Sequence, residues 1–302
     1  MTDFALSRPL DIGEGLTQSE VEDVFQTNFG YQFKGITLRA PDEGRYVILL
    51  ANEGEIYDDE LGQGDEFTYL GEGVQEKGDQ KETASNKALI DAIQDPIPIY
   101  LFTSTEGLDD YEYRGLVEVQ DYEYVSDGAR MVYRFQIERL GISSWEEYQE
   151  TEKTIQEATS DSPELTEDTT QYTTQERKVR SSVFSRKVKQ AYDYTCAVCG
   201  AQRFSPEGRP EVEAAHVYPK SENGADDPRN GLALCKFHHW AFDSGWISVD
   251  NDRNILLKDC ADQDPLEEIA SLAGRELLEP DDPDAALHQI FIQGHRQLHG
   301  FE

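Results

Sequence analysis

Two short-spaced pairs of soft ligands constrain the fold of this 302-residue chain more than any other feature. The first pair is Cys196 and Cys199, and the second is Cys235 and His238. A tight turn can present both members of such a pair to one ion, and four such ligands suit tetrahedral zinc. The alternatives are a disulfide, which a reducing cytoplasm disfavours, and buried unpaired cysteines. The sequence therefore predicts structural Zn²⁺, with Cys260 as the weaker choice for the fourth ligand in place of His238.

A second set of polar residues lies between and beside these pairs, in the order His216, Asn230, His239 and Asp243. Histidine has an ordinary pKa near neutrality, so His216 suits a general base. His239 and Asp243 are four residues apart, so on a helix they share one face and can bind one metal ion. Phosphodiester hydrolysis needs both a deprotonated water and a cation on the phosphate oxygens. The set therefore indicates metal-assisted hydrolysis of a phosphodiester.

The order and spacing of these residues resemble the HNH nuclease family over residues 192–254. The resemblance implies a β-hairpin followed by a helix that grips a catalytic Mg²⁺ or Mn²⁺, the whole stapled by zinc. It also implies that His216 and His239 are catalytic, and that Asn230 fixes the loop and orients His216.

One position departs from the family pattern. Many members carry an acidic residue or a histidine as a metal ligand just before the catalytic histidine, and here that position is Ala215. The catalytic ion would then rely on His239, Asp243 and water, with Glu213 as a weaker helper. A non-catalytic, zinc-stapled DNA-binding module is the alternative interpretation of the whole region.

The first half of the chain has the pattern of a β domain. Short apolar and aromatic runs at residues 46–50, 97–102 and 131–137 are bounded by Gly, Asp and Pro, as strands are. Residues 83–94 carry apolar side chains at helical spacing. Many short strands with one inserted helix predict a barrel-like β domain.

Six segments of this half resemble, in order, the SRA (YDG) family: residues 55–60, 65–73, 78–80, 86–89, 111–119 and 133–139. Arg114 stands where the family usually has Asp. The resemblance implies a PUA-like barrel that flips a modified cytosine, 5-methyl- or 5-hydroxymethylcytosine, out of the duplex into a pocket. Such a pocket needs an aromatic platform and polar groups for the base edge.

The pocket candidates lie in the first two of these segments, and they are Tyr57, Asp58, Asp59, Thr68, Tyr69 and Leu70. The tyrosines would stack on the base, and one of the aspartates would accept from its exocyclic amine. The backbone near Thr68 and Leu70 would supply hydrogen-bond donors to the base edge. Strand packing is the alternative role for the tyrosines, and an acidic turn is the alternative for the aspartates.

Residues 143–176 are rich in Thr, Glu and Asp, and we expect a linker that is helical over 145–148 and disordered later. Beyond it the charge reverses, with no acid between Glu176 and Asp193. The basic residues there are Arg177, Lys178, Arg180, Arg186, Lys187 and Lys189. They are predicted to contact the DNA backbone, the alternative being a solvated helix face. After the metal region we expect a hairpin of residues 246–249 and 254–257, a helix over 266–278, and a final helix with packing or surface histidines.

The chain as a whole carries 61 acidic and 27 basic side chains, a net charge of −34. Acid in every segment, with few lysines, favours a salt-loving, haloarchaeal protein over an ordinary acidic one. A hydrophobic fraction of 37% allows sizeable cores. No apolar run approaches the roughly 18 residues of a membrane helix. The first residues lack a secretory signal, so we expect a cytoplasmic protein.

Together these observations predict an α+β chain with an SRA-like domain at 1–142, a linker at 143–176 and an HNH domain at 177–302. The function they indicate is a modification-dependent restriction endonuclease that acts on double-stranded DNA with modified bases. One HNH site cuts one strand, so we expect a homodimer. The alternatives are a reader of another mark (phosphorothioate or methyladenine), a nuclease that reads no mark, and the non-catalytic module.

Overall fold

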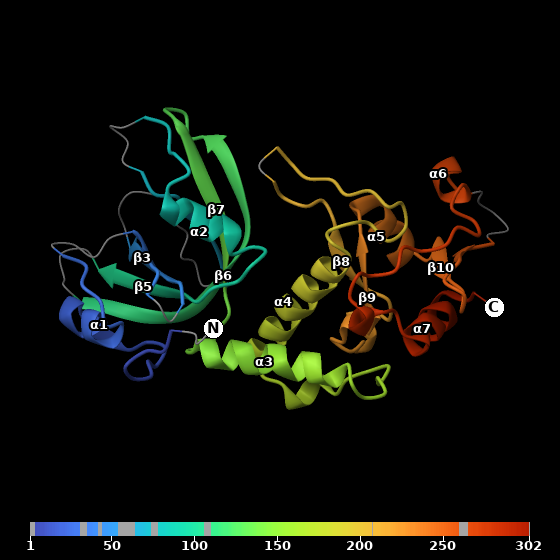
Figure 1. Ribbon diagram of the computed structural model, residues 1–302, viewed down its shortest axis with the longest axis horizontal. Helices are drawn as coiled ribbons and strands as arrows, with labels where there is room; N and C mark the ends of the chain where they lie inside the picture. Colours follow the sequence, from blue (N-terminus) through green and yellow to red (C-terminus); the bar gives the residue numbers. More distant parts are fainter. Residues whose placement is uncertain are drawn as a thin grey trace. The chain divides into compact units, whose positions relative to one another are not determined.

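The computed structural model describes residues 4–30, 35–41, 44–53, 64–73, 78–105, 110–206, 208–259 and 265–301. The chain forms two compact units, Met1–Gln149 and Glu150–Glu302 (Figure 1). The division falls inside α3 (Trp145–Ala158). Both units mix helices and strands, which confirms the predicted α+β class. Among the residues described, no helix is long and apolar enough to cross a membrane.

The first unit is built on one sheet whose strands are ordered β2-β3-β5-β6-β7-β4, with β1 paired to β6. Their bounds are β1 (Gly15–Thr17), β2 (Ile36–Arg39), β3 (Tyr46–Glu53), β4 (Glu66–Leu70), β5 (Ile99–Thr105), β6 (Asp110–Ser126) and β7 (Met131–Arg139). Only β3 and β5 run parallel among these pairs. The strands expected over 46–50, 97–102 and 131–137 are confirmed as β3, β5 and β7.

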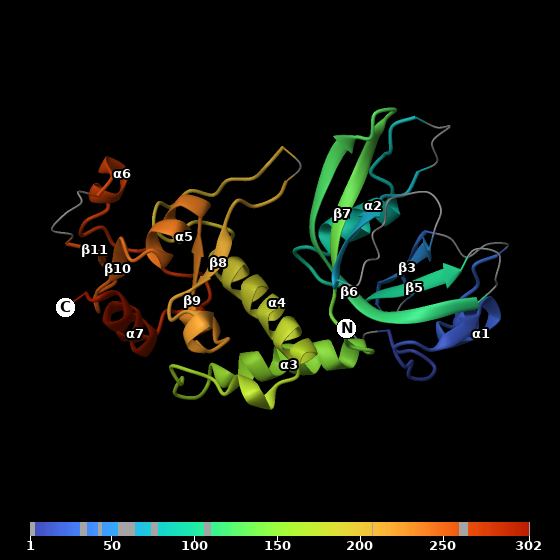
Figure 2. The ribbon, with the colours of Figure 1, turned by 180° about the vertical axis from the view of Figure 1, so that it is seen from behind.

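The long strand β6 joins two parts of this sheet. Its first half pairs with β5 and its second half with β7 (Figure 2). The register of the second pairing shifts between Val119 and Asp121. A bulge of this kind bends a strand. The unit also holds α1 (Gln18–Val24) and α2 (Ala84–Asp91), the helix expected over 83–94. Thr83 caps α2, which buries Ala88 and Leu89 in the core.

The segment over 150–176 is folded, so the expectation of disorder there is wrong. Helix α3 continues to Ala158 and buries Ile155, and Leu165 packs against the core of the second unit. The guanidinium of Arg229 donates to the carbonyls of Ala158, Thr159 and Asp161 at the end of α3. These apolar contacts and the satisfied helix end hold a segment whose composition is nearly all polar.

The second unit holds two short hairpins surrounded by helices. Its helices are η2 (Thr169–Gln171), α4 (Thr174–Ala191), η3 (Lys220–Glu222), η4 (Pro228–Asn230), α5 (Lys236–Asp243), α6 (Glu267–Ala270), η5 (Pro283–Ala285) and α7 (Gln289–His299), where η marks a 3₁₀ turn. Strand β8 (Glu213–His216) pairs with β9 (Gly231–Leu234), and β10 (Ile247–Val249) pairs with β11 (Ile255–Leu257), the predicted hairpin. The helix expected over 266–278 is only α6, because Gly274 turns left-handed and the chain then bridges to Asn254.

Helix α4 packs directly against the β8–β9 hairpin. A capping box of Thr173 and Glu176 starts the helix, whose apolar face includes Phe184 and Val188. A Cβ on Gly231 would lie 2.2 Å from a methyl carbon of Val188, so this strand position requires glycine. The close approach fixes the hairpin that carries His216.

Candidate active site and metal centre

The four predicted zinc ligands come together in the second unit. Cys196 and Cys199 lie in the turn after α4, Cys235 is the N-cap of α5, and His238 lies in the first turn of that helix. Their ligand atoms all lie within 4.8 Å of one another. His238 Nδ1 is 3.1 Å from Cys235 Sγ and 3.4 Å from Cys196 Sγ. A tetrahedral zinc ion with ordinary bond lengths separates S and N ligands by about 3.6 Å, so the group fits.

Burial shifts the protonation of two members of this cluster. Burial raises the pKa of the Cys196 thiol to about 12, so a thiolate there needs a neighbouring positive charge. Burial lowers the pKa of His238, which keeps its imidazole neutral and able to bind a metal. Cys260, the other candidate for fourth ligand, lies outside the described residues.

Next to this cluster, the β8–β9 hairpin and α5 bring the histidines together. His216 ends β8 and pairs with Gly231 across the hairpin. His239 and Asp243 lie one turn apart on α5, with His239 Nε2 3.3 Å from an oxygen of Asp243. His216, His239 and Asp243 all line one cavity of about 660 Å³.

Asn230 holds the loop between the two strands. Its side-chain oxygen accepts from the backbone N–H of Tyr218 at 2.8 Å, and its amide donates to the carbonyls of Tyr218 and Ala225 at 3.0 and 2.9 Å. Its backbone carbonyl accepts from Val217, the residue after His216. Asn230 is fully buried. It thus makes the loop contacts that the family resemblance implied.

His239 has a carboxylate at each ring nitrogen. Glu213 Oε2 lies 2.8 Å from Nδ1, and Asp243 lies on the Nε2 side. One ion cannot use both edges of the ring. Because a metal-binding histidine usually donates its other N–H to a carboxylate, this geometry suits an ion shared by Nε2 and Asp243, with Glu213 fixing Nδ1.

Helix α7 forms a wall of the cavity that the sequence did not indicate. The wall is made by His295, Leu298 and His299. His295 is buried, with Nδ1 2.8 Å from Ser248 Oγ, so it is a packing residue as expected. His299 is half-buried. Some fifty residues and no shared spacing separate these side chains from α5, so no local pattern could place them beside it.

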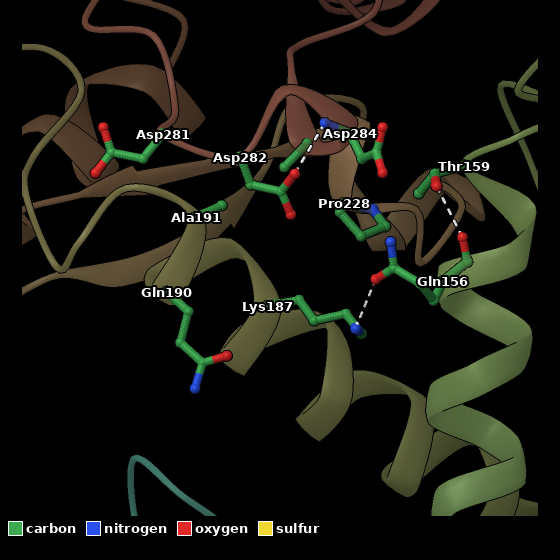
Figure 3. Close-up of a pocket in the computed structure, with 10 residues that line it drawn as sticks. Gln156, Thr159, Lys187, Gln190, Ala191, Pro228, Asp281, Asp282 and Asp284 are labelled. Atoms are coloured by element: carbon green, nitrogen blue, oxygen red, sulfur yellow. Dashed lines mark hydrogen bonds between the residues drawn. The ribbon is translucent and has the colours of Figure 1, made fainter.

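The basic run of α4 is largely engaged within its own unit. Arg180 pairs with Glu167 at 3.0 Å, and Arg186 pairs with Glu152 at 2.9 Å. Lys187 donates to Gln156 at 2.8 Å beside a separate cavity of about 340 Å³, into which Asp282 and Asp284 also project (Figure 3). Arg177 Nε donates to the carbonyl of Thr173 at the start of the helix. Lys178 and Lys189, which were also predicted to contact the DNA backbone, lie on the same helix. At least three of the six cations therefore already have acidic or amide partners.

Three of the predicted base-pocket residues lie on β4, while Tyr57, Asp58 and Asp59 lie outside the described residues. Tyr69 is buried in the core and donates to the Leu50 carbonyl at 3.0 Å, so it takes the packing role. Thr68 bonds to the side chain of Gln136, and Leu70 is half-buried.

Residues 71–73, which follow β4, are held by three side chains. Gln80 donates to the Gly71 carbonyl at 2.6 Å, Asn86 bonds to both backbone groups of Glu72, and Arg130 donates to the Gly73 carbonyl. All three side chains are buried. They position the end of β4. Gln80 lies in one of the segments that resemble the SRA family, whereas no sequence pattern pointed to Arg130.

Two family models match the chain: the SAD/SRA domain over residues 24–141 and the HNH endonuclease over residues 196–250. No curated protein matches the chain. A solved structure described as a modification-dependent TagI restriction endonuclease is 21% identical with a TM-score of 0.56, and the match covers 99% of this chain and 96% of that one. It shows a shared fold through both units.

Other solved structures are similar to about half of the chain. The SRA domain of SUVH5 in complex with fully methylated CG DNA is 23% identical with a TM-score of 0.38, covering 46% of this chain and 96% of that chain. SUVH6 of Arabidopsis thaliana is 24% identical with a TM-score of 0.36, covering 50% and 30%.

Proposed function

We propose that this chain, which carries an SRA domain followed by an HNH endonuclease domain, is a modification-dependent DNA endonuclease. Its SRA domain would bind duplex DNA that contains 5-methyl- or 5-hydroxymethylcytosine, and its HNH domain would hydrolyse the backbone nearby. The observation that carries the proposal is the single cavity lined by His216, His239 and Asp243. The similar fold of a protein described as modification-dependent supports it.

The chemistry of the cut follows from the cavity. His216 would take the proton from the attacking water as a general base. His239 Nε2 and Asp243 would hold Mg²⁺ or Mn²⁺, for which an oxygen ligand with one imidazole is a suitable donor set. That ion, when bound, supplies positive charge to the phosphate oxygens. Glu213 fills no direct ligand position here, since it contacts the opposite ring nitrogen.

The structural metal has a separate task. Zn²⁺ at Cys196, Cys199, Cys235 and His238 would tie the turn after α4 to the start of α5. His238 and His239 are neighbours on that helix, about 100° apart around its axis, so each can serve a different ion. The zinc site thereby fixes the helix that carries the catalytic ligands.

Target choice would rest on the first unit. A flipped cytosine needs stacking and hydrogen-bond partners. Tyr57, Asp58 and Asp59 remain the proposed pocket residues, with backbone at Thr68 and Leu70. Tyr69 is buried, so it is not proposed to stack on the flipped base. The basic side chains of α4 would add phosphate contacts.

Cutting both strands requires two active sites, so we propose a homodimer on its DNA. The acid surplus of −34 would suit a cytoplasm of high salt, as in haloarchaea. In such a medium counterion release drives little binding, so specificity would come mainly from the base pocket and from metal–phosphate bonds.

Digestion of matched plasmids tests the proposal. They would carry no mark, methylcytosine, hydroxymethylcytosine, methyladenine or phosphorothioate, in molar salt with Mg²⁺ or Mn²⁺. We expect cutting of the two cytosine-modified plasmids only. Equal cutting of all plasmids would refute the reader, and cutting of another marked plasmid alone would reassign the mark. No cutting of any plasmid would favour the non-catalytic module.

A further inference from the structure

A buried carboxylate lies directly behind the proposed general base. Asp226 stands in the turn before η4, and its side chain is only 1% exposed. Its Oδ1 lies 3.0 Å from Nε2 of His216. The acid belongs to none of the metal or HNH positions identified from the sequence.

Three charged groups from three elements face Asp226. His216 comes from β8, Lys220 from η3 with its Nζ at 2.7 Å, and Arg180 from α4 with its Nε at 4.0 Å. Glu167 in turn pairs with both Lys220 and Arg180. Two carboxylates therefore face two permanent cations, so the net charge of the cluster is zero while His216 is neutral.

The carboxylate of Asp226 stays ionised at neutral pH. Burial alone would raise its pKa, but hydrogen bonds from His216 and Lys220 bring the pKa below its usual value. An ionised carboxylate only accepts hydrogen bonds, so the proton of a neutral His216 must sit on Nε2. Nδ1 is then left with its lone pair, and it makes no hydrogen bond within the described part of the chain.

The ring of His216 is also held flat. Phe184 of α4 stacks on it, with ring centroids 3.9 Å apart and planes 15° apart. The ring meanwhile lines the cavity shared with His239 and Asp243, and Asp243 interacts with it electrostatically. Stacking sets the plane of the ring, and Asp226 sets its rotation within that plane.

We propose that Asp226 is the positioning residue of the general base, holding the proton of His216 on Nε2 so that Nδ1 faces the cavity as the proton acceptor. This inference rests on the proposed nuclease function. It adds a role for Lys220 and Arg180: they share the negative charge of Asp226, so that the carboxylate orients His216 without locking it in its protonated form. Glu167 completes this cluster from the segment between α3 and α4.

The test compares Asp226→Asn and Lys220→Met in the full, zinc-loaded chain. Asparagine keeps the shape of aspartate but can donate to Nε2 and so favours the other tautomer. For Asp226→Asn we expect kcat on modified DNA to fall about 100-fold or more, because a general base contributes a rate factor of about 10²–10⁴ and is misplaced in this variant. DNA affinity and KM of Asp226→Asn should stay within about twofold, because the Asp226 side chain is only 1% exposed.

The pH profiles of the two variants should move in opposite directions. Removing the charge of Asp226 disfavours the imidazolium, so the acid limb of kcat/KM moves to lower pH. Removing the charge of Lys220 leaves Asp226 uncompensated, so the acid limb moves to higher pH. A residue that merely supports the fold would not produce opposite shifts. If Asp226→Asn fails to fold, the Lys220→Met profile decides, since that side chain is 36% exposed.

A spectroscopic measurement separates this inference from the nuclease proposal. Nitrogen-15 NMR of the six histidines, with His216 assigned by His216→Ala, reports which ring nitrogen carries the proton. We expect the Nε2–H form in the wild type and a changed population in Asp226→Asn. An Nδ1–H form in the wild type, or a cutting Asp226→Asn variant with unchanged kcat and pH profile, would overturn the inference. A wild type that cuts no DNA would refute the nuclease alone.

Discussion

Replacing Asn230 by alanine should weaken the second unit more than any exposed substitution. The side chain makes three hydrogen bonds, at 2.8, 3.0 and 2.9 Å, and is fully buried. At about 1 kcal/mol for each bond, the loss is about 3 kcal/mol. For a unit of about 150 residues this lowers the melting temperature by about 6–12 °C.

The assay is thermal unfolding of the full, zinc-loaded chain by calorimetry, with the transition of the second unit followed. Asn251→Ala is the matched control, because Asn251 is exposed and accepts one bond, from Arg296 at 2.8 Å. We expect less than about 0.5 kcal/mol from it. If the two variants melt within about 2 °C of each other, Asn230 does not hold the loop as described, and the assigned role of Asn230 fails.

Three further outcomes follow from the same unit. Chelation of zinc should cost it about 3 kcal/mol or more, seen as a lower melting temperature with release of one zinc per chain, and an unchanged transition would count against the site. Glu213→Gln should weaken Mn²⁺ binding measured by calorimetry by about 10–100-fold, whereas Glu211→Gln, a surface partner of Arg203, should not. Burial, together with the nearby His299, lowers the pKa of His295 to about 3, against about 6.5 in an unfolded chain. Between these two pH values only the unfolded chain binds a proton at His295, so the free energy of unfolding should fall as the pH drops from about 6.5 toward 3. His295→Gln should flatten this slope in acid-unfolding curves.

The sequence was sufficient for those parts of the fold that repeat or pair at short range. The four residues predicted to bind zinc lie in two pairs of neighbours, and the expectation that they meet is confirmed. Strands β3, β5 and β7 were visible because each is a short apolar run between turn residues. The order of His216, Asn230 and His239 placed the nuclease hairpin, because a β-hairpin and its following helix are local in the chain.

Long-range contacts were the parts that the sequence could not supply. Asp226 is one acid among 61, so nothing in its surroundings distinguishes a buried partner of His216 from an acidic turn. The cations of α4 looked available because their partners, Glu152 and Glu167, lie in a stretch with the composition of a linker. Tyr69 alternates with Thr68 on β4, and only the packed sheet shows that its ring lies in the core.

One measurement tests the central claim, that a reader of modified cytosine directs an HNH cut, most directly. Wild type and His216→Ala would be given the same duplex with and without one methylcytosine or hydroxymethylcytosine, and binding and single-turnover cutting would both be followed with Mn²⁺. We predict that both proteins prefer the modified duplex, that the wild type cuts it, and that the variant cuts neither. Cutting by His216→Ala at the wild-type rate, or equal binding of modified and plain duplex, would contradict the account.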